Sequence, residues 1–208
     1  MKKIGVIFWA GFLIFALSDL ARAGGTLGVA VFGGASKAVG GTYNTGQKSA
    51  DILQTGAVYG VSFSNDITSH YRIEVQAFFT DLPFKKSARP NQLREQVFVL
   101  PALVFSNNLR WRFGPISAYV PFGVGIYFWK YAVDGPRSDA VLYQGEKLQK
   151  MSPGFSTGLG LSVRVQKHVS VFGESRYQYI LCKDKFFFGE KFTEQAVLLS
   201  TVGIRFLF

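Results

Sequence analysis

Apolar and polar residues alternate along most of the chain in short segments. Each segment is rich in Val, Phe, Tyr, Leu and Gly and has a period of two residues, which predicts β-strands rather than helices. In the last segment Val202, Ile204, Phe206 and Phe208 share one face, and Arg205 falls on the other. Eight such strands are expected: Thr26–Ala35, Asp51–Ser64, His70–Thr80, Arg94–Ser106, Ile116–Tyr131, Ser152–Val165, Val169–Cys182 and Gln195–Phe208.

The connections between these segments alternate in length. Those after the second, fourth and sixth segments are short: Asn65–Ser69, Asn107–Pro115 and Gln166–His168. Those after the first, third, fifth and seventh are long: Ser36–Ala50, Asp81–Leu93, Ala132–Met151 and Lys183–Glu194. Membrane barrels have short periplasmic turns and long outer loops. We therefore predict an all-β, eight-stranded antiparallel up-and-down transmembrane barrel over residues 24–208, with a soluble all-β domain as the alternative.

Residue types indicate which face of the strands points inward. One set of rows is apolar, whereas the opposite rows carry long polar residues and small ones such as Gly123, Gly125, Gly158 and Gly160. The interior of an eight-stranded barrel is only wide enough for side chains, so we expect the polar rows inside. Aromatic residues near the strand ends of the apolar face are expected to form interfacial girdles: Tyr59, Phe63, Tyr71, Tyr177, Tyr179, Phe206 and Phe208.

Six charged residues fall in the polar rows and form a candidate interior network. They are Arg72, Glu74, Arg164, Glu174, Arg176 and Arg205. Buried charges are costly unless they are paired, so Glu74 and Glu174 are each expected to hold an arginine. The favoured interpretation is a salt-bridge network that plugs and stiffens the barrel. The alternative is a narrow path whose excess of arginine favours anions.

The first 23 residues have the pattern of a secretory signal peptide. Lys2 and Lys3 precede the apolar run Ile4–Leu17, and the small residues of Ala21–Ala23 suit a signal peptidase. The apolar run is shorter than the roughly 20 residues that a spanning helix needs. The residue directly after the predicted cut is Gly24 and not a cysteine, so a lipoprotein is not expected. Cleavage after Ala23 leaves about 185 residues, which suits one domain.

The formal net charge is +10, and removal of the predicted signal peptide leaves about +8. A basic chain often binds nucleic acid, but an exported protein meets none. Outer-membrane lipid and lipopolysaccharide phosphates are therefore the expected partners, with Lys85, Lys86 and Arg89 as candidates for lipopolysaccharide contact. Two interpretations of Phe186–Phe188 are open: the seventh and eighth strands extend past the membrane and pair there, or the three rings contact a lipid, a partner or an apolar ligand. We expect a monomer without a cofactor.

Catalytic chemistry is not expected. The pair His168 and Ser170 resembles the His-x-Ser element of lipid A deacylases, but it lies at a predicted periplasmic turn, whereas lipid A lies in the outer leaflet. His70, His168 and the single cysteine, Cys182, make no metal-binding spacing and no internal disulfide. The paired glycines have no following helix, so a nucleotide-binding motif is not supported.

With these residues in view, the chain resembles the small bacterial outer-membrane β-barrel superfamily, which includes the outer-membrane protein A, X and W types and the opacity-type surface proteins. The resemblance rests on Tyr119–Tyr131, Pro153–Tyr179 and Thr201–Phe208. In that family a terminal aromatic residue is read by the outer-membrane assembly machinery, which implies that Phe208 is an assembly signal and that this machinery is a partner.

The resemblance also implies residence in the outer membrane of a Gram-negative cell. Its members differ in activity, and the fold does not fix the function. The first hypothesis is a non-enzymatic structural or surface-interaction protein that acts through its extracellular loops. A narrow channel for small or apolar solutes is the alternative, and a lipid A-modifying enzyme is a third, weaker hypothesis.

Overall fold

The computed structural model describes residues 25–43, 47–86, 96–133, 138–140, 142–143, 146–147, 149–182 and 193–208. Three sequence predictions concern residues outside these ranges: the signal peptide, the lipopolysaccharide contact of Arg89 and the role of Phe186–Phe188. Within the described ranges, no helix has the length and hydrophobicity of a membrane-spanning helix.

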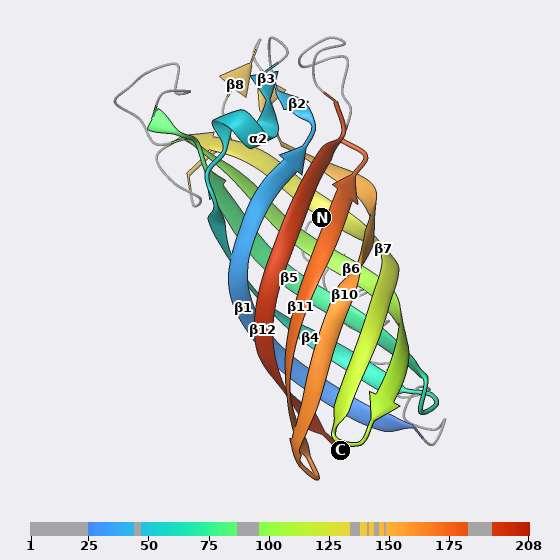
Figure 1. Ribbon diagram of the computed structural model, residues 1–208. Helices are drawn as coiled ribbons and strands as arrows, with labels where there is room; N and C mark the ends of the chain where they lie inside the picture. The colour runs from blue at the N-terminus through green and yellow to red at the C-terminus, as the bar shows by residue number, and fades with distance from the viewer. Residues whose placement is uncertain are drawn as a thin grey trace.

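Eight long strands form one closed barrel (Figure 1). The strands are β1 (Thr26–Gly40), β4 (Gly56–Asp66), β5 (Tyr71–Pro83), β6 (Gln96–Phe113), β7 (Ile116–Val133), β10 (Gln149–Gln166), β11 (Val169–Ile180) and β12 (Gln195–Leu207). Each is antiparallel to the next along the chain, and β1 pairs with both β4 and β12. The predicted eight-stranded antiparallel up-and-down barrel is confirmed.

The two ends of the barrel differ, as the lengths of the predicted connections indicated. The turn end holds the short turns at 67–70, 114–115 and 167–168, the start of β1 and the carboxyl terminus, Phe208 (Figure 1, bottom). The loop end, at the top of Figure 1, holds the longer connections. These contain β2 (Thr42–Tyr43), β3 (Gln47–Lys48), α2 (Ser49–Ile52), β8 (Leu142–Tyr143) and β9 (Glu146–Lys147).

The largest error in the predicted boundaries lies in β6. The sequence suggested a turn over Asn107–Pro115, but β6 continues to Phe113 and only residues 114–115 turn. Gly114 makes this turn at a φ of 62°, where glycine is favoured because it has no Cβ. Asn108 belongs to the inward row of β6, where its Nδ2 donates to Glu74 Oε2 at 2.9 Å. Asn108, a residue type common in turns, therefore forms a hydrogen bond in the barrel interior instead.

The second predicted strand also begins too early. Residues Asp51 and Ile52 lie in α2, and the strand starts at Gly56. Ile52 and the adjacent Leu53 are buried, and Leu53 bridges to Phe84 beyond the end of β5. The short helix therefore adds apolar side chains to the packing at the loop end.

The apolar rows face outward, as expected. On the outer surface Val124, Leu159 and Val202 are exposed by 56%, 68% and 67%. The aromatic residues Tyr59 and Phe208, at opposite ends of the barrel, are exposed on the same side. Since water disfavours such a broad apolar surface, the outside of the barrel requires a cover of comparable apolarity.

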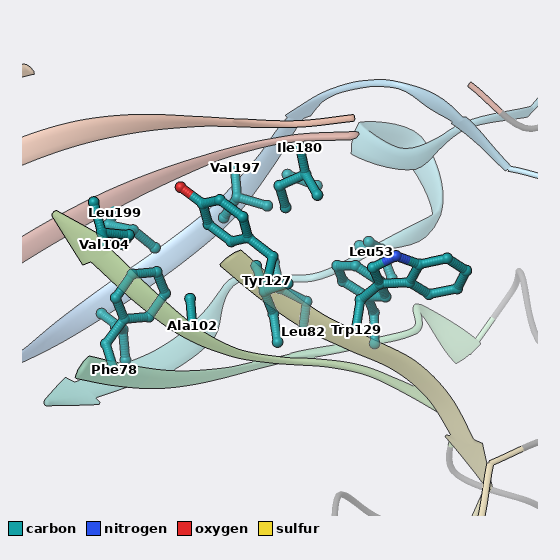
Figure 2. Packing of buried hydrophobic residues seen from close by; sticks show 14 of the residues in the cluster. Leu53, Phe78, Leu82, Ala102, Val104, Tyr127, Trp129, Ile180, Val197 and Leu199 are labelled. Atoms are coloured by element: carbon teal, nitrogen blue, oxygen red, sulfur yellow. The ribbon is translucent and has the colours of Figure 1, made fainter. Parts of the chain in front are cut away.

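Among the described residues, the inward rows carry charged side chains only in the half of the barrel nearer the turn end. Toward the loop end they are filled by large apolar side chains, an arrangement that Figure 2 shows from close by. We call this region the apolar half; its members include Leu53, Phe78, Leu82, Phe98, Leu100, Ala102, Val104, Tyr127, Trp129, Ile180, Val197 and Leu199. The expectation of a polar interior is therefore wrong for this half.

Polar groups also lie within the apolar half, and most of them are paired, although Gln178 Nε2 has no hydrogen-bond partner among the described residues. Tyr127 Oη donates to Gln178 Oε1 at 2.5 Å, and Trp129 Nε1 donates to Ser152 Oγ at 3.0 Å. These bonds avoid the cost of leaving buried donors unpaired. The aromatic rings also contact one another, as Phe98 does with Tyr131 at 4.9 Å between ring centroids.

Candidate functional site: the charged half of the barrel interior

The middle of the barrel is occupied by one carboxylate with four hydrogen-bond donors. Glu74 lies on the inward row of β5 and is fully buried. Its Oε1 accepts from Ser62 Oγ at 2.7 Å and from Arg205 Nη2 at 2.6 Å. Its Oε2 accepts from Asn108 Nδ2 at 2.9 Å and from Arg176 Nη2 at 2.8 Å. The four bonds use the acceptor capacity of the carboxylate, which stabilises a charge that burial alone would disfavour.

Glu174 and Arg176 extend this arrangement from β11. Arg176 Nε donates to Glu174 Oε1 at 2.9 Å, and its Nη2 donates to Glu174 Oε2 at 3.1 Å. Tyr119 Oη and Gln76 Nε2 complete the bonds to Glu174, each at 3.1 Å. Arg176 therefore bridges both carboxylates, and its planar guanidinium suits this two-sided pairing.

Arg205 brings the last charge from β12 and is buried completely. Besides its bond to Glu74, its guanidinium carbon lies 4.8 Å from the centroid of the Phe172 ring, in a cation–π contact. We call Glu74, Glu174, Arg176 and Arg205 the central cluster. Its two carboxylates and two guanidinium groups balance, and the pairing of Glu74 and Glu174 with arginine is as the sequence led us to expect.

A second ionic group lies nearer the turn end, around a carboxylate that sequence analysis missed. Asp66 ends β4 and accepts from Arg72 Nε at 2.5 Å and Arg110 Nη1 at 2.6 Å on one oxygen. Its other oxygen accepts from Arg112 Nη2 at 3.2 Å. We call these four residues the Asp66 cluster. Arg72 therefore pairs with Asp66 and not with Glu74 or Glu174.

Asp66, Arg110 and Arg112 were missed because they fell in predicted connections. Residues 65–69 and 107–115 are rich in turn-forming types, so their side chains received no inward or outward assignment. In the structure β4 reaches Asp66 and β6 reaches Phe113, and register pairs Asp66 with Arg72. A continued count of every second residue from Ser64 on β4 and from Ser106 on β6 would have placed all three inside.

Arg164 departs from the expected network. It lies near the end of β10, where the register shifts between Arg164 and Gln166, and its side chain is exposed. It lines the mouth of the turn end with Arg72, Arg110 and Arg112. Its position so close to the strand end leaves it accessible to water, and it is not part of the central cluster.

His168 and Ser170, the pair singled out in the sequence, lie in different environments. The Nδ1 atom of His168 lies 3.0 Å from the carbonyl oxygen of Leu207, and His168 is exposed at the turn. Ser170 is buried on the inward row of β11. The other histidine, His70, contacts the carbonyl of Arg110 at 3.2 Å. Among the described residues no group of three or more His, Cys, Asp or Glu side chains could hold a metal ion.

The remaining candidate residues lie at the loop end. Lys86 is exposed, whereas Lys85 is half-buried and its Nζ donates to the carbonyl of Ala50 at 3.5 Å. Cys182 is buried just beyond β11, and burial raises the pKa of its thiol to about 12. The cysteine is a free thiol, which agrees with the absence of a disulfide partner in the sequence.

The comparisons with known proteins agree with the barrel geometry. No family model and no curated protein matches the chain. Solved structures do match. Neisserial surface protein A is 14% identical with a TM-score of 0.58, and the match covers 88% of this chain and 97% of that one. A major outer membrane protein from Thermus thermophilus is 11% identical with a TM-score of 0.57, covering 89% and 100%.

Ail, the attachment invasion locus protein of Yersinia pestis, is also similar in structure. It is 13% identical with a TM-score of 0.52, and the match covers 88% of this chain and 99% of Ail. These similarities define the class of fold, which is that of the small eight-stranded outer-membrane β-barrels. The resemblance inferred from the sequence is thus confirmed at the level of fold.

Proposed function

We propose that this chain is a small integral outer-membrane protein without enzymatic activity, which acts as a closed structural barrel and through its outer loops. In this proposal the predicted signal peptide is removed after Ala23. The turn end faces the periplasm, the loop end faces outward, and Phe208 serves as the assembly signal. The broad apolar outer surface supports burial of the barrel wall in lipid.

The observation that carries the proposal of a closed barrel is the burial of large side chains across the interior at two levels. Tyr119, Phe172, Arg176 and Arg205 are at most 2% exposed at the level of the central cluster. Toward the loop end, Trp129, Leu82 and other apolar side chains fill the remaining width. An ion would have to displace paired charges and then cross an apolar region, and both steps are costly.

The proposed partners are lipopolysaccharide, outer-membrane lipid and the assembly machinery. Lys85, Lys86 and Arg89 are the proposed contacts with lipopolysaccharide phosphates. The structure of Ail was determined in complex with a heparin analogue, sucrose octasulfate. By analogy, we propose a polyanion as the partner of the basic connection between β5 and β6, which contains these three residues. We also propose that the protein works as a monomer.

Conductance in planar bilayers tests the closed barrel against the alternative of a narrow channel. We expect the purified protein to give no reproducible discrete steps in salt on the order of 1 M, at which open barrels conduct easily. An Arg205→Met variant tests whether the central cluster lines a path. Discrete steps in the natural protein that disappear in this variant would overturn the closed barrel. Unchanged lipid A mass spectra on overexpression are expected if the protein is not a lipid A-modifying enzyme.

A further inference from the structure

The mouth of the turn end holds more positive charge than its carboxylate can balance. A pocket there is lined by Arg72, Arg110, Arg112 and Arg164, together with Tyr119 and three serine residues. Asp66 is the carboxylate that pairs with the first three arginines. Among the side chains at this mouth, four guanidinium groups and one carboxylate leave three positive charges unbalanced. The central cluster does not compensate this excess, because its own charges are equal in number.

The arginines also carry more donors than Asp66 can accept. A guanidinium has five N–H donors, and a carboxylate offers about four acceptor positions. Arg110 is 4% exposed, and its Nε has no hydrogen-bond partner among the described residues. Arg112 is repelled by both Arg110 and Arg164. An additional acceptor with negative charge would relieve both the unused donors and the repulsion.

The size and lining of the pocket restrict what this acceptor can be. The cavity has a volume of about 70 Å³. One water molecule needs roughly 10–15 Å³ when the volume is measured in the same way. The space suits a few waters or one small tetrahedral ion. The inner wall is Tyr119, whose hydroxyl donates to Glu174, so the pocket is closed toward the middle of the barrel. Three serines add neutral hydroxyl groups to its wall.

We propose that the turn-end mouth is a binding site for a phosphate-type oxyanion. Arg112 and Arg164 are the principal ligands, since both are more accessible than Arg72 and Arg110. Arg110 Nε and the serine hydroxyls supply further donors, and Asp66 holds the arginine side chains in place. Two sources share this chemistry: free phosphate from the adjoining aqueous compartment and the phosphodiester of a neighbouring anionic lipid.

Titration calorimetry with inorganic phosphate tests the site, using the full barrel in nanodiscs of neutral phosphatidylcholine. We expect saturable binding in the natural protein and about tenfold weaker binding in Arg164→Gln, since one charge-assisted bond is lost. Lys167→Gln is the matched control. It removes the same charge from the adjacent turn, but Lys167 does not line the pocket. The phosphate affinity of this variant should therefore stay within about twofold of that of the natural protein.

The lipid composition of the nanodisc distinguishes the two sources. If a lipid phosphodiester is the natural occupant, phosphate should bind more weakly in discs that contain phosphatidylglycerol, because the headgroup competes. If free phosphate is the occupant, affinity should be equal in the two kinds of disc at matched ionic strength. Both results support an oxyanion site.

Two outcomes would overturn the site. One is a lack of saturable phosphate binding in either disc. The other is an equal loss of affinity in Arg164→Gln and Lys167→Gln, which would indicate a diffuse effect of surface charge. Arg164 is exposed near a strand end, so its replacement should leave the barrel folded, which unchanged heat-modifiable migration on a gel would verify.

Discussion

The two halves of the barrel interior solve the same packing problem with different chemistry. Near the turn end, nine charged side chains are held by mutual pairing or by access to the mouth: Asp66, Arg72, Glu74, Arg110, Arg112, Arg164, Glu174, Arg176 and Arg205. Toward the loop end, apolar side chains fill the same width. We call the first region the charged half.

A single inward row crosses from one chemistry to the other. In β5 the row runs through Arg72, Glu74 and Gln76 and continues with Phe78, Thr80 and Leu82, so that one neutral hydroxyl remains between two apolar side chains. The comparison teaches that the inside of a small barrel need not be polar throughout. A paired ionic network derives its stability from geometry, because each charge must meet its partner. An apolar core derives its stability from volume, because it must leave no void.

The largest effect is expected from removal of the cation that both carboxylates share. Arg176→Met leaves Glu174 without a cation and Glu74 with Arg205 alone. Because a buried charge without its partner is costly, we expect a loss of about 3–5 kcal/mol in the free energy of unfolding. Urea titration of the protein in lipid vesicles, followed by heat-modifiable gel migration, measures it.

The double variant Arg176→Met, Glu174→Gln is the control for this prediction. It removes one charge of each sign, so the remaining Glu74 and Arg205 balance. If pairing governs the charged half, the double variant should recover at least half of the loss, since contacting residues are not additive. A double variant that is no more stable than Arg176→Met would show that volume matters here as well.

The apolar half should respond to a loss of volume instead. Leu82 is fully buried on the inward row of β5. Leu82→Ala removes contacts and leaves a cavity, for which we expect a loss of about 3 kcal/mol in the same urea titration. Leu82→Met nearly conserves volume and should cost less than about 1.5 kcal/mol. Equal losses in the two variants would break the contrast between the halves.

The strand order, the closed barrel and the outward apolar face could be predicted from the sequence, because they depend on period-two alternation and on the lengths of connections. The apolar half could not be recognised in the same way. Where a strand is apolar on both faces, alternation disappears, as in the run at residues 97–105 of β6. That loss of alternation was itself the available signal.

The partners of the charged residues were predicted only in part. Arg176 pairs with Glu174, and Arg205 pairs with Glu74, as expected of inward charges. Arg72 instead pairs with Asp66, and this depends on strand register, which alternation does not specify. Side chains at the end of a strand were also misjudged, because Arg164 shares the inward phase but lies at the accessible mouth.

A smaller effect is expected where the backbone of Gly160 lies against the ring of Tyr119 in the charged half. A Cβ at Gly160 would lie 2.1 Å from Tyr119 Cζ, so a side chain there must displace the ring that donates to Glu174. We expect Gly160→Ala to cost about 1–3 kcal/mol in the free energy of unfolding. The control is Gly173→Ala, because a Cβ at Gly173 meets its nearest atoms at 3.8 Å. Equal effects would mean that close packing against Tyr119 is unimportant.

The smallest effect is expected for the Cys182 thiol, a titratable group that is buried in the apolar half. Burial raises the pKa of the Cys182 thiol from 9.0 to about 12. At a pH of about 8 this lowers the thiolate fraction about a thousandfold, and the thiolate is the reactive form. We expect iodoacetamide to modify Cys182 at least about 100-fold more slowly than a cysteine placed at the exposed Ser69, in the variant Ser69→Cys, Cys182→Ser.

The same raised pKa has a consequence for stability at high pH. The unfolded chain loses the thiol proton near pH 9 whereas the folded barrel keeps it, so the contribution of the buried neutral thiol is fully present below pH 9 and falls as the pH rises toward about 12. The free energy of unfolding of the natural protein should therefore decline relative to Cys182→Ala across this window. Parallel curves of the free energy of unfolding against pH, or rapid modification of Cys182 in the folded barrel, would show that water reaches this thiol. The contrast between the two halves would then not include the loop end of the apolar half.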